Sequence, residues 1–462
     1  MKEPMSVDRG ERIVVVSDLH IGAGEIDDFR PELECHLVAF LLDHLGADPQ
    51  PLELVINGDC FDFVTAAPWD DPQLESRSAE RVPLCFTQEQ SCAKLKRIVE
   101  AHGRAFDALA RFLATGAHRL TILPGNHDAD LFWPHVRRDL LAALQERSAA
   151  VERVKFVLER AYVIEREGVR HWIEHGHQHD PANSFFVGRK ERWSEAAPPI
   201  LKDAMGHSRL LECPGTLGLV RYINGWRRKY PSIGYIKPNS RILMALASHR
   251  GFKEPGRPLL VAWQLAQLLG WDVDWHTALS EESDIHRSCQ ALLSEMVDNL
   301  GEDEEAAFNR FLAEHGVKLH STLKTSLEMP ANCSRILNGV AASLGGPPSG
   351  QAMQVDDDSL GLALGSLKDV ENQALIAMAR RLVQAGKAHH VITGHTHAPV
   401  TALDGRFING GCWVPNHEVD SVGAAKRVIF RHGSVPYCLS YVDVPVGAAP
   451  RCETFAQGMV QV

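Results

Sequence analysis

The chain has 462 residues and a formal net charge of -11, with 45% hydrophobic and 23% charged residues. This composition is ordinary for a globular protein, and the length allows two domains or one core with a large insertion. The acidic balance argues against non-specific binding of nucleic acid, which requires a basic surface. It does not exclude a small anionic substrate, because bound metal ions reverse the local charge.

Three further features bear on location. The first twelve residues are polar and charged, without the apolar stretch of a signal peptide. The most apolar stretch, roughly 259–271, is shorter than the about 20 residues that span a bilayer. Ten cysteines are scattered without paired spacing, as is typical of reduced thiols. We therefore expect a cytoplasmic protein with no transmembrane segment; peripheral membrane contact and the oligomeric state stay open.

Residues 12–181 alternate between short apolar runs and helical patterns, which predicts an α/β (α+β) fold with a mainly parallel sheet. The runs rich in β-branched residues, typical of buried strands, lie at 13–16, 54–56, 120–123 and 171–173. The helical patterns lie at 31–46, 94–114 and 137–146. A hairpin turn is expected at Glu167-Gly168, so this part forms the first half of a core.

Strand patterns stop after residue 181, and the segment 182–366 is mostly helical in pattern. We interpret it as an insertion or cap within a split core. The core resumes over 367–445, and residues 446–462 are expected to form a C-terminal tail. In this second part a helix is predicted at 369–386, with strands around 390–392, 407–409, 427–431 and 437–442.

Five polar segments follow five of the apolar runs, where α/β sheets usually place their sites. They are Ser17–His20, Asn57–Cys60, Gly125–Asp128, His175–His177 and Gly394–His397. Any one of them alone would pass for a turn or a cap. Together they supply carboxylates, an amide oxygen and at least four imidazoles, which suits two divalent metal ions such as Mn²⁺, Fe or Zn²⁺. The absence of thiolates argues against a structural zinc site.

Spacing suggests how these side chains would share the metals. Asp18 and His20 are two residues apart on a chain expected to be extended, so both can bind one ion. His395 and His397 have the same spacing. Asp59 follows a glycine, and its two oxygens can bridge two ions. Two ions about 3.5–4 Å apart would clamp a phosphate and activate a bridging hydroxide for in-line attack.

As a set, the segments resemble the motifs of the calcineurin-like metallophosphoesterase superfamily: D-x-H, G-D-x-x-D, G-N-H-D/E, a strand-end His and G-H-x-H. The resemblance covers about 12–180 and 370–445 and leaves the insertion uncovered. It implies a β-sandwich flanked by helices, with a dinuclear metal site at one rim. It also implies hydrolysis of a phosphomonoester, phosphodiester or pyrophosphate bond, with Mn²⁺ the metal that we favour.

The resemblance also implies individual roles. One ion would be held by Asp18, His20, Asp59 and His397, and the other by Asp59, Asn126, His175 and His395. His127 would touch the phosphate, beside Asn126, and either stabilise charge or protonate the leaving oxygen. Asp128 would orient His127, and Asp62 would brace the second motif. In the family the strand-end His directly precedes a Gly, which favours His175 as the fourth-motif ligand. The choice between His175 and His177 stays open. If His175 is the ligand, His177 would contact substrate.

The substrate is less defined than the chemistry. A basic stretch within the insertion reads either as an anion-binding or membrane-surface patch or as the solvent face of a helix. Its cations are Arg221, Arg227, Arg228, Lys229 and Lys237. UDP-2,3-diacylglucosamine pyrophosphatases also have a helical cap over a dinuclear site, but show H-G-D where this chain has His175-Gly176-His177. A lipid-precursor hydrolase of that kind is one alternative, and a non-catalytic metal-bearing binding protein is another; retention of His127 favours an enzyme.

Overall fold

The structure is a computed structural model that describes most of the predicted core. It describes residues 11–24, 29–48, 50–67, 87–147, 150–180, 183–187, 191–192, 198–202 and 206–211, short stretches between 213 and 245, and then 367–419, 421–430 and 434–461. The described residues fall into two compact units, of which the larger contains residues before 236, from 371 to 416 and from 434 to 461. The helical insertion predicted over 182–366 lies largely outside the described residues and stays a prediction there. Its described first part differs from the expectation, because five short strands lie between residues 186 and 237, where we expected none.

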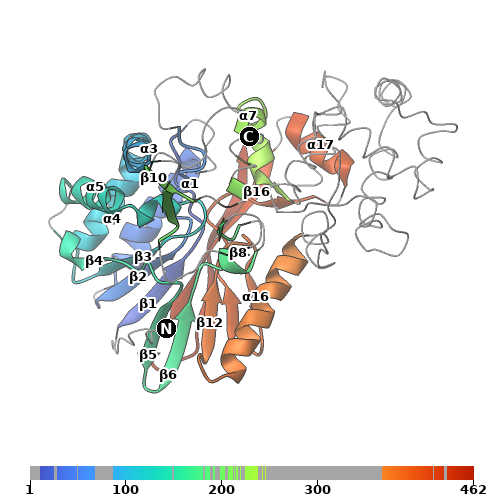
Figure 1. Ribbon diagram of the computed structural model, residues 1–462. Coiled ribbons are helices and arrows are strands. Elements are labelled where there is room, and N and C mark those ends of the chain that lie inside the picture. The colour runs from blue at the N-terminus through green and yellow to red at the C-terminus, as the bar shows by residue number, and fades with distance from the viewer. Residues whose placement is uncertain are drawn as a thin grey trace, which may run out of the picture. The chain divides into compact units, whose positions relative to one another are not determined.

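A six-stranded sheet forms the first layer of the larger unit, in the order β17-β16-β1-β2-β3-β4 (Figure 1). Its strands are β1 (Arg12–Val16), β2 (Leu52–Asn57), β3 (Arg119–Leu123), β4 (Val154–Phe156), β16 (Ser434–Val444) and β17 (Arg451–Gln461). Strands β1 to β4 run parallel, and β16 and β17 add two antiparallel strands at one edge. Part of the segment that we expected as a C-terminal tail is therefore a strand of this sheet.

A five-stranded sheet forms the second layer, in the order β13-β14-β12-β6-β5. Its strands are β5 (Tyr162–Arg166), β6 (Val169–Ile173), β12 (His390–Thr393), β13 (Val400–Ala402) and β14 (Phe407–Asn409). Strands β5 and β6 make a hairpin whose turn, Glu167-Gly168, has positive φ at both residues. One fully buried cluster contains Val15 and Val55 from the first sheet and Ile173 and Ile392 from the second, so the two sheets pack face to face as a sandwich.

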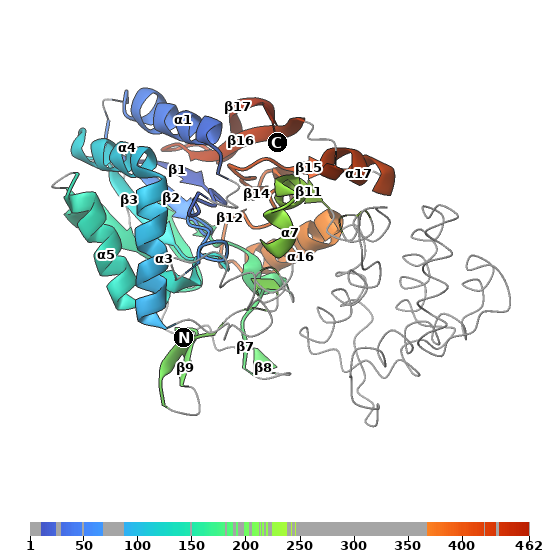
Figure 2. The same ribbon diagram turned by 90° about the horizontal axis from the view of Figure 1, so that it is seen from above.

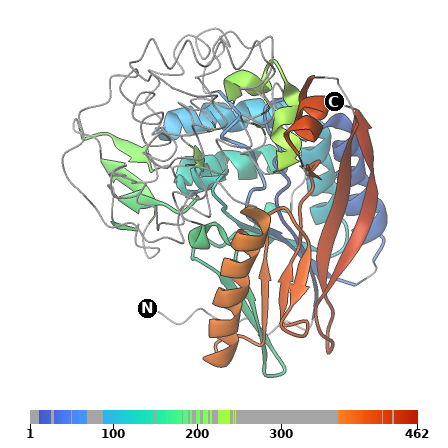
Figure 3. The same cartoon turned by 90° about the vertical axis from the view of Figure 1, so that its right-hand side faces the viewer.

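Helices cover both outer faces of the sandwich (Figures 2 and 3). The first sheet is covered by α1 (Pro31–Ala39), continued by a π-helical segment (Phe40–Leu45), and by α3 (Gln88–Ala101), α4 (Gly103–Ala114) and α5 (Pro134–Gln145). Buried Val14 and Leu54 share a core cluster with Phe106, Phe112 and Leu140 of these helices. On the second sheet, α16 (Leu367–Gln384) packs through Leu375 and Met378 against Val391 and Phe407. The helix-flanked β-sandwich is confirmed.

Short elements complete the described chain. In the larger unit they are the 3₁₀ turns Ala129–Phe132, Val151–Arg153, His177–His179 and Pro231–Tyr235, the hairpins β7 (Phe186–Val187) with β8 (Glu191–Arg192) and β9 (Ile200–Lys202) with β10 (Ser208–Leu210), and α7 (Asn224–Arg227). In the smaller unit they are β11 (Ile236–Lys237), parallel to β15 (His417–Glu418), and α17 (Val422–Phe430).

Helix α17 corrects one prediction, because we expected a strand around 427–431. Ala425 and Ile429, four residues apart, are both buried, which is the spacing of one helix face rather than of a strand. Within the part of the chain that the structure describes, no helix has both the length and the apolar character needed to cross a bilayer.

Candidate metal centre

The five polar segments follow β1, β2, β3, β6 and β12, and hydrogen bonds between their backbones join them at one rim of the sandwich. The amide of His20 donates to the carbonyl of Asp59 at 2.9 Å, and the amide of Gly394 donates to the carbonyl of His175, also at 2.9 Å. The amide of Phe63 donates to the carbonyl of His127 at 3.2 Å. These bonds bring together segments that lie between 39 and 219 residues apart in the sequence.

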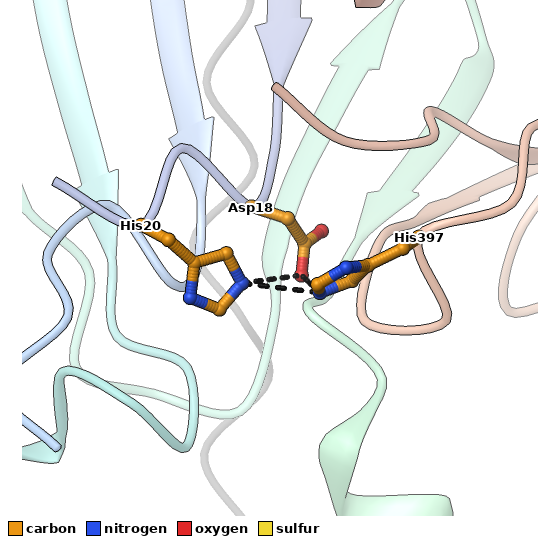
Figure 4. Close-up of side chains that lie close together, drawn as sticks. All are labelled: Asp18, His20 and His397. Carbon is orange, nitrogen blue, oxygen red and sulfur yellow. Dashed lines mark hydrogen bonds and ion pairs between the residues drawn. The ribbon is translucent and has the colours of Figure 1, made fainter. Parts of the chain in front are cut away.

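One cluster of potential metal ligands contains Asp18, His20 and His397 (Figure 4). The Nε2 atom of His397 lies 3.3 Å from Oδ1 of Asp18 and 3.1 Å from Nε2 of His20. Asp18 and His20 are buried, and His397 is only slightly exposed. Three ligand atoms that converge in this way, from two distant segments, can hold one divalent ion.

A second cluster contains Asp59, His175 and His395. Asp59 lies between the two clusters, because its Oδ2 is 3.3 Å from Nε2 of His175 and 3.8 Å from Nε2 of His20. Its other oxygen, Oδ1, accepts a hydrogen bond from the backbone amide of His127 at 2.8 Å. One carboxylate oxygen therefore faces ligands of both clusters.

In the fourth motif, the structure brings His175 rather than His177 into the cluster. The Nδ1 atom of His175 lies 2.9 Å from the carbonyl oxygen of Asn57, so Nδ1 carries the proton and Nε2 faces Asp59. His177 is also buried, but its ring packs edge-on against Phe185, with the centroids 5.5 Å apart. The pKa of His177 lies well below its ordinary value, chiefly because the side chain is buried and secondly because of the charges of His175 and His395. His177 is therefore a neutral side chain next to the candidate ligands.

The backbone at the candidate ligands differs from the extended chain that we expected. We expected Asp18 and His20 to share a metal because they lie on extended chain, but both have left-handed backbones, as do three other candidate ligands. The φ angles are 56° at Asp18, 49° at His20, 50° at Asp59, 72° at His395 and 60° at His397. A non-glycine residue in this region costs of order 1–3 kcal/mol, and such residues are concentrated at functional sites. The sharp turns, and not strand alternation, aim these side chains.

Three motif glycines make room for the ligands. A Cβ atom at Gly58 would overlap the ring of His175, and one at Gly125 would overlap the carboxylate of Asp59. At Gly394 it would overlap the hydroxyl of Ser17, which hydrogen-bonds to Asp18. The close approach of the loops therefore requires glycine at these positions.

Electrostatics couple the ligands strongly. Burial alone would lower the pKa of His175, but Asp59 and Asp18 outweigh it and raise that pKa to about 10. Burial would likewise raise the pKa of Asp59, but His175, followed by His127, holds it well below the ordinary value. At His20, burial and the nearby His127 lower the pKa to about 3. In the metal-free protein His175 is thus protonated at neutral pH, and binding of a cation at its Nε2 would release a proton.

His127 is paired with a different carboxylate from the one that we expected. Its Nδ1 lies 3.0 Å from Oδ1 of Asp62, a buried side chain three residues after Asp59. Burial would lower the pKa of His127, but Asp59 and Asp62 raise it to about 9. Asp62 therefore orients His127 and stabilises its protonated form.

Asp128 has a structural role instead. Its buried carboxylate accepts hydrogen bonds from the backbone amides of Asp59, Cys60, Phe61 and Gly125, at 3.2, 2.8, 3.3 and 2.6 Å. Both oxygens are occupied by the second and third motif loops, so our expectation that Asp128 orients His127 is wrong. The roles expected for Asp62 and Asp128 are exchanged: Asp128 braces the second motif.

The basic stretch contributes one residue near this pair. Arg227 of α7 is only 3% exposed, and its charge acts on both Asp62 and His127. Helix α7 is attached to the loop after Asp62, because Nδ2 of Asn224 donates to the carbonyl of Val64 at 3.0 Å. The sequence placed Arg227 among basic residues without indicating which of them would be buried near the site.

Phe63, Val64 and Phe185 line a small cavity beside Asn126 and His127. Its volume of about 10 Å³ corresponds to about one water molecule. The cavity thus has Asn126 and His127 among its lining residues together with apolar side chains, one of which, Phe185, belongs to the chain that follows the fourth motif.

Comparison with known proteins agrees with this geometry. The family model described as calcineurin-like phosphoesterase matches residues 11–236, which contain four of the five motifs. The chain has no match among curated proteins. The fifth motif, Gly394–His397, lies beyond the matched residues, and the fold returns it to the same rim. The chain belongs to the calcineurin-like metallophosphoesterase superfamily.

Proposed function

We propose that the protein is a phosphoesterase that depends on two divalent metal ions and hydrolyses a phosphomonoester, phosphodiester or pyrophosphate bond. The observation that carries this proposal is the position of Asp59, whose Oδ2 lies near His20 of one cluster and His175 of the other. A single carboxylate between two sets of ligands is the arrangement that a dinuclear site requires.

The residues present fit two ions. We assign Asp18, His20, Asp59 and His397 to one ion and Asp59, Asn126, His175 and His395 to the other. Oδ1 of Asn126 is buried without a hydrogen-bond partner among the described residues, as expected of an atom that faces a cation. Oδ1 of Asp18 and Nε2 of His175 each lie 3.3 Å from another candidate ligand, His397 and Asp59 respectively. The mixed imidazole and carboxylate set suits Mn²⁺, which we favour, or Fe or Zn²⁺. When bound, two such ions neutralise phosphate charge and lower the pKa of water.

His127 supplies the protein's own acid. In the metal-free protein Asp59 and Asp62 raise its pKa to about 9, and Asp62 engages Nδ1, so a proton at Nε2 can be given to a phosphate oxygen or to the leaving oxygen. His20 packs edge-on against His127, with the ring centroids 4.6 Å apart, which restricts the ring. Asn126 and His177 are proposed to contact the substrate beside it. A non-catalytic binding protein would not require His127 and Asp62 to be paired in this way.

We also propose a location and a substrate class. The described cysteines are all free thiols, which supports a reducing compartment such as the cytoplasm. A small phosphorylated molecule remains the favoured substrate class. A lipid precursor, as for UDP-2,3-diacylglucosamine pyrophosphatases, is the alternative to test.

The deciding experiment measures hydrolysis of bis-p-nitrophenyl phosphate and of p-nitrophenyl phosphate by purified protein that has been stripped of metal and reloaded with Mn²⁺. We expect turnover that a chelator abolishes, and the preferred ester separates a diesterase from a monoesterase. An Asp59→Asn variant purified in the same way controls for contaminating phosphatases. Two bound ions without turnover of either ester or of a UDP-linked pyrophosphate would contradict the enzyme proposal.

A further inference from the structure

The segment that follows the fourth motif carries two polar residues that connect ligands of the second cluster. Oδ2 of Asp180 lies 3.0 Å from Nε2 of His395. The same oxygen accepts a hydrogen bond from Nδ2 of Asn183. Oδ1 of Asn183 in turn accepts from Nδ2 of Asn126 at 3.3 Å. His395, Asp180, Asn183 and Asn126 therefore form a continuous hydrogen-bonded relay.

The backbone holds this relay in place. The amide of Asp180 closes a 3₁₀ turn on the carbonyl of His177 at 3.1 Å. The carbonyl of Asp180 then accepts from the amides of Asn183, at 3.1 Å, and Ser184, at 2.8 Å. Asp180 is only 7% exposed. Two side chains on one short turn are thus presented to the site together.

The hydrogen bonds of Asp180 and Asn183 determine which atom of His395 and of Asn126 is left to face a cation. A carboxylate accepts hydrogen bonds, so Nε2 of His395 carries the proton and Nδ1 keeps the free lone pair. Because Nδ2 of Asn126 donates to Asn183, its Oδ1 points the other way, and this oxygen is buried without a hydrogen-bond partner among the described residues. Outer carboxylates and amides that orient ligands in this way typically change metal affinity about 10–100-fold.

The relay also balances charge. In our assignment the first ion is held by two carboxylates, Asp18 and Asp59, whereas the second ion has only the shared Asp59. A carboxylate behind His395 places a further negative charge near the second ion. Asp180 therefore compensates for the ligand charge that the second site lacks.

We propose that Asp180 and Asn183 are positioning residues for the second metal ion, acting through His395 and Asn126. The inference rests on the proposed dinuclear site. It assigns a function to the chain immediately after the fourth motif, because the start of the predicted insertion completes the metal centre rather than only covering it.

The test is a titration of metal-free protein with Mn²⁺, in which free Mn²⁺ is counted by electron paramagnetic resonance. We expect two ions on the wild type, and in Asp180→Ala about 10–100-fold weaker binding of one ion with the other unchanged. Asn183→Ala should weaken the same ion. Asp180→Asn, which keeps an oxygen acceptor for Nε2, should retain more affinity than Asp180→Ala. Asp43→Ala, which removes an exposed carboxylate, is the matched control.

A spectroscopic measurement separates positioning from a general loss of structure. In Zn²⁺-loaded protein labelled with ¹⁵N-histidine, the ring Nε2–H of His395 should be visible, identified by its loss in His395→Ala. It should shift or exchange rapidly in Asp180→Ala. Unchanged affinity for both ions in Asp180→Ala, or equal weakening of both, would overturn the inference. A wild type that binds fewer than two ions would instead overturn the dinuclear proposal.

Discussion

The close approach of Gly58 to His175 leads to a prediction that can be worked out quantitatively. Gly58 has a φ of 81°, and a Cβ atom there would overlap Cγ and Nδ1 of His175. The ring has no free space, because His175 is fully buried, with Nδ1 bonded to the carbonyl of Asn57 and Nε2 3.3 Å from Asp59. In Gly58→Ala the ring must therefore leave its position.

Two costs add in this variant. Alanine with a left-handed backbone costs about 1–2 kcal/mol, and overpacking of a buried site costs about 1–3 kcal/mol more. The free energy of unfolding should thus fall by about 2–5 kcal/mol. Gly168 provides the matched control, since its φ is 79° but a Cβ atom there has no neighbour within 4 Å. Gly168→Ala should cost only the backbone term, about 1–2 kcal/mol.

Urea unfolding of both metal-free variants measures the difference, and metal analysis after reloading measures its effect on the site. We expect Gly58→Ala to be the less stable variant and to retain one ion instead of two, because His175 belongs to only one cluster. Gly168→Ala should retain both ions. Equal destabilisation of the two variants, with two ions on each, would refute the argument that the glycine exists to admit His175.

Further variants separate the roles of the other residues. His127→Ala should keep both ions but lose about 10²–10⁴-fold in turnover; full activity would remove its assigned role. Asp62→Asn should shift the alkaline limb of the profile of kcat/KM against pH to lower pH, because Asp62 raises the pKa of His127, and an unmoved limb would contradict the pairing. Asp59→Asn should weaken both ions together, so metal analysis showing two retained ions would exclude bridging. Burial and neighbouring cations lower the pKa of His171 to about 4, so the folded protein favours the neutral form of this side chain. The contribution of His171 to the free energy of unfolding is complete above a pH of about 6.5. It is lost as the pH falls toward 4, by about 3 kcal/mol in all. His171→Phe should therefore lose less stability than the wild type between pH 7 and 4.5 in urea unfolding, and identical losses would refute this cause.

Local patterns sufficed for much of the fold. Apolar runs such as 13–16 and 54–56 could be recognised as strands because a strand buried on both faces needs a continuous run of β-branched side chains. The helix after residue 367 and the hairpin turn at Glu167-Gly168 were also evident from periodicity and turn chemistry. The edge strand β17 was missed, because its sequence, RCETFAQGMVQ, mixes polar and apolar residues without a clear alternation.

The composition of the site could likewise be recognised from the sequence, since carboxylates, imidazoles and amides are typical ligands of divalent metals in whatever fold they occur. Which side chains meet could not be read. His175 and His177 are equivalent by composition, and only the tertiary contacts place the first of them beside Asp59. Asp62 and Asp128 are both carboxylates near motif residues, but their partners lie about 65 to 69 positions away.

The positions of Asp180 and Asn183 depend on tertiary structure for the same reason. Nothing in their local sequence distinguishes them from solvated loop residues; their contacts with His395 and Asn126 arise because two sheets bring their strand ends to one rim. The kinds of side chain available for a metal centre could be recognised from the local motifs alone. Which of their atoms meet follows from the tertiary structure, because hydrogen-bond partners and the electrostatic environment of a buried group are set by neighbours that are distant along the chain.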